Sequence, residues 1–364
     1  MIGLAVADEL TRHGAEVIVL EKGLRAGAEA SSAAAGILSP HGEAHGPGPL
    51  LSLLLAGFQL IPEMAARLQA LTHVDLLYKA NGMLAVALSD EEEKKLAADI
   101  DWQEKAGLRL ERVSAAQVKA LEPAIDGPVR WGVRWPQMAQ IDNTALIEAY
   151  CRAIGKQGGI IRTNREVSRF ITKGDRVVGV ETLSEQITAD VVVNCAGSWA
   201  RFDGGLPFQL PVVPVKGQLL QFKTTSPLVR HVVVSGGAYL VQRSTVRLIA
   251  GTTVERAGYD KTVTNSGSRS VLDGITRICS AFGSLKPETA WAGLRPGTPD
   301  DMPILGETPL KGLFVAAGHY RNGILLAPLT GRIMGDLILK QKSPMDISPF
   351  SILRFQNKGA SGAS

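Results

Sequence analysis

The 364-residue sequence contains little cysteine, and its cysteines are not spaced for cross-links. Cys151, Cys195 and Cys279 lie far apart, are odd in number and form no CxxC pair. Such a set argues against a disulfide scaffold and a thiolate metal site, and it is typical of a reducing compartment. We therefore expect a cytoplasmic protein.

A strong charge of one sign is also missing. The formal net charge is +4, and the most charged stretch, DEEEKKLAADIDWQEK, mixes both signs as a solvated helix face does. Nucleic-acid binding would call for a basic run or patch, and the sequence has no basic run. We expect no nucleic-acid partner.

Long apolar runs and a leader segment are absent as well. The most apolar window, PLLSLLLAGFQLIPEM, holds about a dozen residues before its proline, whereas a membrane span needs roughly 20. No charged region precedes an apolar run at the N-terminus, so we expect no signal peptide. The window predicts a buried helix and no membrane span.

Motifs for metal binding or nucleophilic catalysis are equally scarce. His41 and His45 in HGEAH have the spacing of a helical zinc motif, but prolines and glycines on both sides argue against a helix. The sequence contains no nucleophile elbow and no convincing Cys–His arrangement. We expect no metal.

The start of the chain has the pattern of the second half of a dinucleotide-binding βαβ unit. Residues Ile2–His13 have helical periodicity, Gly14 follows, and EVIVLEKG predicts a buried parallel strand that ends near Glu21. Gly3 would be the last glycine of a GxGxxG fingerprint, and Glu21 would bind ribose hydroxyls, which disfavours NADP. The alternative is an ordinary helix–strand pair with a glutamate at the strand end. The first strand and first glycines of the unit would lie ahead of residue 1, so we expect the central strand to be missing from this chain.

Three later segments share the features of close backbone approach to a ligand. Ala30–Leu38 consists mostly of small residues, Val192–Ala200 ends a strand at Gly197, and Ala316–Gly331 runs from a strand through a glycine and a polar loop into a helix. A helix N-terminus presents free N–H groups to an electron-rich atom. Separate segments that converge on one site suit an extended cofactor such as FAD.

The remaining patterns predict an α/β protein with two domains. Helices are expected near 50–72, 90–106, 143–157 and 267–282, and TKGDR predicts a hairpin between two strands. Residues 23–48 are expected to be a long loop. We predict a Rossmann-like FAD-binding domain built from discontinuous segments, with an inserted mixed or antiparallel sheet domain for the substrate and a C-terminal tail whose last residues, NKGASGAS, are frayed. The cofactor domain would comprise 1–75, 140–208 and 290–345, the substrate domain 76–139 and 209–289, and the tail 346–364.

Four motifs carry a resemblance to a known family: SSAAAGIL, LPVVPVKGQLL, AWAGLRPGTPDDMPILG and FVAAGHYRNGILLAPLTG. With them the chain resembles, over nearly its whole length, the FAD-dependent D-amino acid oxidase superfamily, and within it most closely the glycine oxidases of the thiamine pathway. The resemblance implies the following FAD contacts: Met1, Ile2 and Gly3 at the pyrophosphate; Glu21 and Lys22 at the ribose; Ala30, Ser31, Ala35, Gly36 and Ile37 along the flavin; Val167 at the adenine; Gly197 and Trp199 lining the cofactor; and His319, Tyr320, Arg321, Asn322, Gly323, Ile324 and Leu325 around the pyrimidine side.

The resemblance also implies that Arg295 holds the substrate carboxylate and that Tyr239 assists it. Independently of any family, GLRPGTPDDMP places Arg295 beside turn residues, where its planar guanidinium can bind a carboxylate bidentately. The alternatives are an ion pair of Arg295 with Asp300 or Asp301, a core position for Tyr239 and a surface position for Arg321, which we also assign to the substrate site.

The expected activity is FAD-dependent oxidation of a small amino acid, such as glycine, sarcosine or a small D-amino acid. The products would be the imine or oxoacid, ammonia and hydrogen peroxide, with molecular oxygen as the electron acceptor; the resemblance also allows a homo-oligomer. Four alternatives stay open: a D-amino acid dehydrogenase that passes electrons to a quinone, a sarcosine-type oxidase, a flavin-dependent tRNA-modifying oxidoreductase, and a flavin-free remnant that acts as an interaction protein.

Overall fold

The computed structural model describes residues 1–358, and it begins with the predicted helix and parallel strand. Helix α1 (Ile2–Arg12) buries Leu4, Val6 and Leu10, and the chain reverses at Gly14, whose φ of 79° favours glycine. Strand β1 (Ile18–Leu20) pairs in parallel with β7 (Ile160–Arg162). The helix, the turn and the parallel pairing are confirmed. The strand is only half-buried, not fully buried as predicted.

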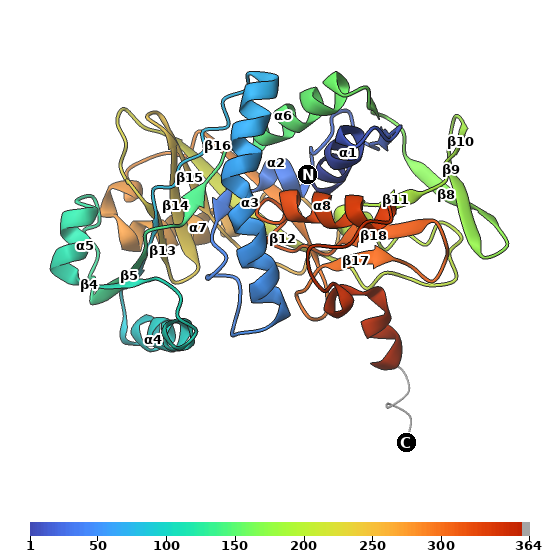
Figure 1. Cartoon of the computed structure of the whole chain (residues 1–364). Coiled ribbons are helices and arrows are strands. Elements are labelled where there is room, and N and C mark those ends of the chain that lie inside the picture. Colours follow the sequence, from blue (N-terminus) through green and yellow to red (C-terminus); the bar gives the residue numbers. More distant parts are fainter. Residues whose placement is uncertain (359–364) are drawn as a thin grey trace.

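A second small sheet lies beside α1. Its strand order is β11 (Val192–Asn194), β18 (Leu313–Ala317) and β17 (Ile304–Glu307), with β11 and β18 parallel. Within residues 1–358, no strand hydrogen-bonds the β1–β7 pair to this sheet. The helices packed around α1 are α6 (Asn143–Lys156) and α8 (Ala327–Ile338), which appear together in Figure 1.

The predicted hairpin forms a three-stranded antiparallel sheet at one end of the molecule (Figure 1). Strands β8 (Val167–Lys173) and β9 (Arg176–Thr182) pair up to Lys173 and Arg176, and β10 (Gln186–Thr188) adds to β9. Gly174, in the turn, has a φ of 61°, so TKGDR forms the turn that its glycine predicts.

The largest sheet has eight strands in the order β16-β12-β15-β14-β13-β3-β5-β4. All pairs are antiparallel except β13 with β3, so the predicted mixed sheet is confirmed. The strands are β3 (Met83–Ala87), β4 (Glu111–Ser114), β5 (Trp131–Trp135), β12 (Val213–Lys223), β13 (Val232–Ser235), β14 (Ala238–Ser244), β15 (Arg247–Gly251) and β16 (Thr289–Gly297).

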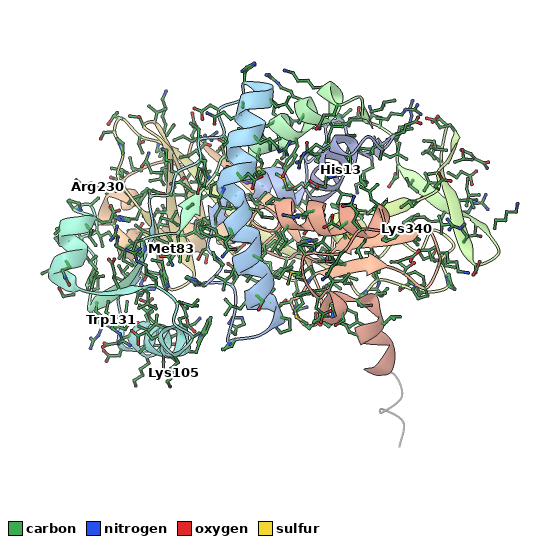
Figure 2. The ribbon with its side chains drawn as sticks, in the orientation of Figure 1. His13, Met83, Lys105, Trp131, Arg230 and Lys340 are labelled. Carbon is green, nitrogen blue, oxygen red and sulfur yellow. The ribbon has the colours of Figure 1, made fainter. Side chains whose placement is uncertain are left out.

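Helices cover this sheet on both faces. On one face, Val271 and Ile275 of α7 (Asn265–Ile278) pack on Leu240 and other strand residues, and α5 (Ala115–Leu121) contributes Val118 to the same cluster. On the other face, α4 (Asp90–Lys105) contributes Ile100. The two sides of the molecule separate clearly in Figure 2, where Trp131 and Arg230 lie at the left and His13 and Lys340 to the right of the long helix α3.

The predicted long loop at 23–48 contains structure of its own. A short helix, α2 (Ala30–Ala33), is followed by β2 (Ile37–Leu38), which pairs with β6 (Ala139–Gln140). The prediction of an unstructured loop was therefore wrong for this part. Strand β6 lies about a hundred residues after β2 in the sequence, and local sequence patterns carry no information about a pairing over that separation.

Helix α3 (Pro49–Thr72) confirms the helix predicted near 50–72, and it continues through Pro62. Pro62 is exposed, and Leu53, Leu54 and Ile61 of the same helix are fully buried. In the described chain this 24-residue helix is long and apolar enough to cross a membrane, which is weak evidence because buried core helices pass the same test.

Short 3-10 turns complete the described chain: Gly197–Trp199, Ser280–Gly283, Ser348–Phe350 and Ile352–Lys358. Phe350 and Ile352 of the proposed tail are buried against the core. The predicted fraying concerned NKGASGAS; its last six residues, 359–364, lie outside the described residues.

Candidate active site

The segments predicted to bind the cofactor meet at the start of α1. The Met1 amine donates a hydrogen bond of 3.0 Å to Ser31 Oγ, and a Cβ placed on Gly3 would lie 3.2 Å from Cys195 Cβ. Glu21 lies near enough for its charge to act on the same amine. Burial, with a smaller effect of the Met1 charge, lowers the pKa of His319 to about 3. Residues from four distant parts of the chain therefore surround one helix N-terminus.

Lys22 and Trp199, both predicted cofactor residues, contact each other directly. The Lys22 ammonium lies 3.4 Å from the centroid of the Trp199 ring, a cation–π contact. Tyr259 also packs near Trp199, with its ring centroid 5.4 Å from that of Trp199. Val167 begins β8 and packs in the same apolar cluster as Leu20, the residue before Glu21.

The small-residue segment lies between the large sheet and α6. The Trp291 indole N–H donates to the Ala33 carbonyl at 3.0 Å, and a Cβ on Gly293 would lie 2.5 Å from Ala33 Cβ. Asn143 Nδ2 donates to the Ser31 carbonyl at 2.7 Å. Gly36, with a φ of 66°, is so close to Ile141 that a Cβ would collide with its carbonyl oxygen. Position 36 therefore requires glycine. The alanine and serine side chains of residues 30–35 are small and take up little space along the backbone.

Arg243 contacts the same small-residue segment, and the sequence analysis did not predict this role. Its side chain is 0% exposed, and its guanidinium donates to the Ala35 carbonyl and, at 3.0 Å, to Gln140 Oε1. Burial lowers the pKa of Arg243 to about 10. An arginine in a strand gives no local sign that it will be buried.

The segment after β18 has the predicted order of strand, glycine, polar loop and helix. Gly318 has a φ of 74°, the Tyr320 N–H donates to the Pro296 carbonyl at 2.9 Å, and α8 begins at Ala327. His319 Nε2 lies 3.0 Å from Thr330 Oγ1, so its ring is held against α8. The rest of this predicted set follows the same turn: Arg321 is exposed, Gly323 is half-buried, and Asn322, Ile324 and Leu325 are buried.

Arg295 projects from β16 across the neighbouring strand. A Cβ on Gly217 would collide with the Arg295 guanidinium, so the glycine leaves the space that the side chain occupies. Its Nη2 donates to Thr252 Oγ1 at 2.8 Å, and its Nη1 donates to the Thr253 carbonyl at 3.2 Å.

The alternative ion pair of Arg295 with Asp300 or Asp301 is wrong. Asp300 is bound by Arg354, whose Nε lies 2.8 Å from Asp300 Oδ2. Among the residues that the structure describes, Arg295 has no carboxylate at salt-bridge distance, and burial lowers its pKa. A desolvated cation without an anionic partner is a ready binding site for a ligand carboxylate.

Tyr239 approaches the same point from the opposite side. It lies over Gly251, where a Cβ would collide with its hydroxyl group. Burial raises the pKa of Tyr239 to about 12, against the opposing effects of the Arg295 charge and a hydrogen bond with Thr252. Arg295 and Tyr239 therefore converge on Thr252, and two glycines keep the sheet surface beneath them clear.

Arg321 is paired, in contrast to Arg295. Its Nη2 lies 2.7 Å from Oε1 of Glu43, a residue that sequence reasoning considered only as part of HGEAH. Burial raises the pKa of Glu43, while the charge of Arg321 opposes that rise. HGEAH forms turns, as its prolines and glycines predict, and the described residues contain no cluster of three metal-ligating side chains.

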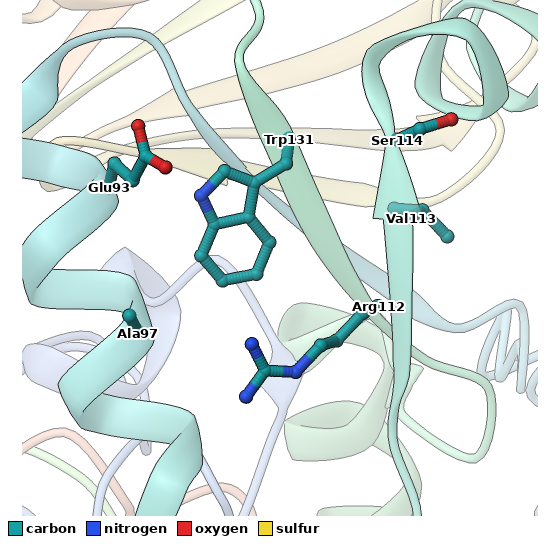
Figure 3. A pocket seen from close by; sticks show the side chains of 6 residues that line it. All are labelled: Glu93, Ala97, Arg112, Val113, Ser114 and Trp131. Atoms are coloured by element: carbon teal, nitrogen blue, oxygen red, sulfur yellow. The ribbon is translucent and has the colours of Figure 1, made fainter.

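A pocket of about 420 Å³ lies away from these residues, between α4, the edge strand β4 and its neighbour β5 (Figure 3). In Figure 3 the Arg112 guanidinium lies beside the Trp131 ring, 5.7 Å from its centroid. None of the predicted site residues lines this pocket.

The assembled residues fit a large, flat, anionic cofactor. Gly197, with a φ of 55°, has no atom within 4 Å of a Cβ position, and the nearest atom to such a position on Gly323 is 3.8 Å away. The helix N-terminus at Met1 suits a phosphate, and the small residues of 30–37 suit a ring system. The bond from the Tyr320 N–H to the Pro296 carbonyl places the loop before α8 beside Arg295, and the fold and the site together are those of the class of proteins that bind a dinucleotide cofactor.

Comparison with known proteins identifies the family. The chain belongs to the DAO family of FAD-dependent oxidoreductases, whose family pattern matches residues 1–337. It is 32% identical to a glycine oxidase of Geobacillus kaustophilus, over 98% of this chain and 96% of that protein. It is 30% identical to a glycine oxidase of Pseudomonas aeruginosa, over 96% of each protein. The crystal structure of the Geobacillus kaustophilus glycine oxidase superimposes with a TM-score of 0.91 at 31% identity, covering 96% of this chain and 95% of the other.

Proposed function

We propose that this protein oxidises a small amino acid, of the size of glycine, sarcosine or D-alanine, with release of ammonia or the matching amine and of hydrogen peroxide. The observation that carries the proposal is the Arg295 guanidinium, which has no carboxylate at salt-bridge distance among the described residues and whose charge acts on the Tyr239 hydroxyl group. The glycine oxidases to which the chain is similar support a glycine-sized substrate.

Arg295 binds and orients the substrate carboxylate in this proposal. Its two Nη groups form a bidentate pair with the carboxylate, and Tyr239 donates a third hydrogen bond from the other side. Because the Tyr239 hydroxyl remains protonated well above neutral pH, it acts as a donor throughout the physiological range. Holding the carboxylate at three points fixes the position of the substrate Cα, and such positioning lowers the barrier of the following step.

FAD, when bound, supplies the hydride acceptor for the substrate Cα–H. Met1, Ile2 and Gly3 would hold its pyrophosphate, Glu21 and Lys22 its ribose, Val167 its adenine end, and Gly197 and Trp199 the adjoining wall. Residues 30–37 would support the flavin ring, and the backbone of 319–325 would stabilise negative charge on its pyrimidine side. No side chain of this set is required as an acid or a base.

Molecular oxygen is the proposed final electron acceptor. The three cysteines are free thiols, which suits the proposed cytoplasmic location. A quinone-linked dehydrogenase would use the same carboxylate site, so the acceptor has to be tested directly.

The test measures flavin absorbance of the purified protein and peroxide formation with glycine, sarcosine and D-alanine. We expect a yellow protein that produces peroxide in air. Oxidation with a quinone but not with oxygen would indicate the dehydrogenase, and absence of flavin would indicate the non-enzymatic alternative.

The carboxylate site is tested with Arg295→Met, which retains an unbranched apolar side chain but removes the charged guanidinium. Loss of a charge-assisted bidentate contact costs about 2–5 kcal/mol, so kcat/KM should fall by at least about thirtyfold while the flavin spectrum is retained. The matched control is Arg134→Met, which removes an arginine paired with Glu111 on the surface of the same sheet. Unchanged activity of Arg295→Met would contradict the assignment.

A further inference from the structure

Glu43 lies close enough to Arg295 and Tyr239 for their charges to interact, although the proposed reaction does not use it. It belongs to the turn segment between β2 and α3, and its side chain is 21% exposed. Its carboxylate is bound by Arg321 at 2.7 Å, and the Arg321 side chain is 45% exposed. This pair joins the 41–48 turns to the loop before α8.

Two guanidinium groups, those of Arg295 and Arg321, lie near enough for their charges to interact. The Tyr320 N–H is bonded to the carbonyl of Pro296, the neighbour of Arg295, so Arg321 lies one residue beyond a direct backbone link to β16. The Tyr239 hydroxyl lies within the electrostatic reach of Arg295, Arg321 and Glu43 together. Two cations at one site would by themselves favour a ligand with two carboxylates. Arg321 is already paired with Glu43, however, so only Arg295 lacks an anionic partner among the described residues.

We propose that Glu43 is a specificity-determining residue: it occupies Arg321 as an internal carboxylate, so that the site accepts monocarboxylate amino acids and rejects those with a second carboxylate. This inference rests on the proposed function and refines its substrate class. A second carboxylate on the substrate has to compete with Glu43 for Arg321 and is repelled by it, which is a repulsive element of the kind that specific sites use. Glycine, which has no side chain, meets neither cost.

The test uses Glu43→Gln, which retains shape and an acceptor for Arg321 but removes the negative charge. The substrates are glycine and two dicarboxylate analogues of it, iminodiacetate and D-aspartate. We expect the ratio of kcat/KM for the dicarboxylates to that for glycine to rise at least tenfold. As a readout independent of turnover, the Kd of malonate relative to that of acetate, followed by the change in flavin absorbance, should fall at least tenfold.

Two further variants separate the charge effect from general disturbance. Glu111→Gln removes a carboxylate from a similar arginine pair at the sheet edge and should leave both ratios unchanged. Glu43→Gln combined with Arg321→Met should lose the gain, because the freed guanidinium is then absent.

The outcomes are distinguishable from failure of the proposed function. If the wild-type protein oxidises glycine but Glu43→Gln changes neither ratio, the role of Glu43 is wrong and the activity stands. If no amino acid is oxidised, the malonate and acetate measurement still decides whether Glu43 excludes a second carboxylate. Should Glu43→Gln lose FAD, Glu43→Ala is measured in the same way, and loss of FAD in both variants would overturn the proposal by showing that Glu43 supports the cofactor.

Discussion

Residues of the same type differ sharply in their surroundings in this protein. Arg295 reaches over Gly217 to a threonine and a carbonyl group, Arg321 binds Glu43, and Arg243 is fully buried beneath Ala35. Desolvation lowers the pKa of Arg295 and Arg243, whereas the charge of Glu43 raises that of Arg321. The partner of each guanidinium, not its residue type, decides whether it can bind a substrate.

A buried histidine makes the stability of the protein depend on pH. His41 is 4% exposed, its Nδ1 has no hydrogen-bond partner within the described chain, and burial lowers its pKa to about 4. A histidine in the unfolded chain has its ordinary pKa near 6.5 and is protonated below that pH. In the folded protein His41 remains neutral until the pH approaches 4. The stabilising contribution is therefore present above pH 6.5 and is lost as the pH falls toward 4.

We predict that His41→Gln weakens this pH dependence. Between pH 6.5 and pH 4.5, each such histidine contributes a slope of about 1.4 kcal/mol per pH unit to the free energy of unfolding. Denaturant unfolding across this range should show a smaller slope for the variant than for the wild type. His13→Gln, which replaces an exposed histidine, is the control and should leave the slope unchanged.

The strands of the large sheet contribute to the site mainly through glycines, which leave space for the side chains that lie above them. Three glycines on the sheet, Gly217, Gly251 and Gly293, lie beneath Arg295, Tyr239 and Ala33 respectively. None of them has a positive φ, so their backbone conformations would accept a side chain and only the space above them would not. The sheet therefore presents a shallow surface on which the long side chains of the site lie flat.

A methyl group on β12 should disturb substrate binding more than folding. Gly217→Ala would displace the Arg295 guanidinium, and a misplacement of about 1 Å at a positioning residue can reduce the rate about a hundredfold. Steady-state kinetics should show kcat/KM reduced by that order, with the flavin content retained. Gly155→Ala in α6, where a Cβ meets no atom within 4 Å, is the matched control; normal kinetics for Gly217→Ala would contradict the described packing.

At the scale of the whole molecule, the site lies where two sheets approach the same helix. The β1–β7 pair and the β11–β18–β17 sheet are not hydrogen-bonded to each other in the described chain, and both pack against α1. The cofactor would contact residues from the first helix, the 30–37 segment, η1 (Gly197–Trp199) and the loop before α8 at once.

FAD should therefore stabilise the entire fold. A ligand that binds only the folded state at a hundred times its Kd adds about 2.7 kcal/mol to the free energy of unfolding. Thermal unfolding of protein stripped of FAD should begin at a lower temperature and return to the holoprotein value when FAD is added back. AMP, which carries only the adenine end, should restore less; equal midpoints with and without FAD would contradict a shared site.

The sequence by itself determined the local elements and the positions of close approach. Periodicity and glycine placement predicted α1, α6, the β8–β9 hairpin and the strand–glycine–helix order of 313–338, because these depend on neighbours within a few residues. The motifs also indicated Arg295 and Tyr239, whose places on the sheet are consistent with the expected carboxylate site.

Only the tertiary structure decided which charged groups face one another. The ion pair of Glu43 with Arg321 joins residues 278 positions apart, and the hydrogen bond from Arg243 to the Ala35 carbonyl joins residues 208 positions apart. Asp300 pairs with Arg354 and not with Arg295. These contacts form because distant segments pack together. The side chains involved have no regular spacing along the sequence, so no local pattern predicts them. The physical reason is that burial and charge act through space, so the chemistry of an arginine is set by the groups that surround it after folding.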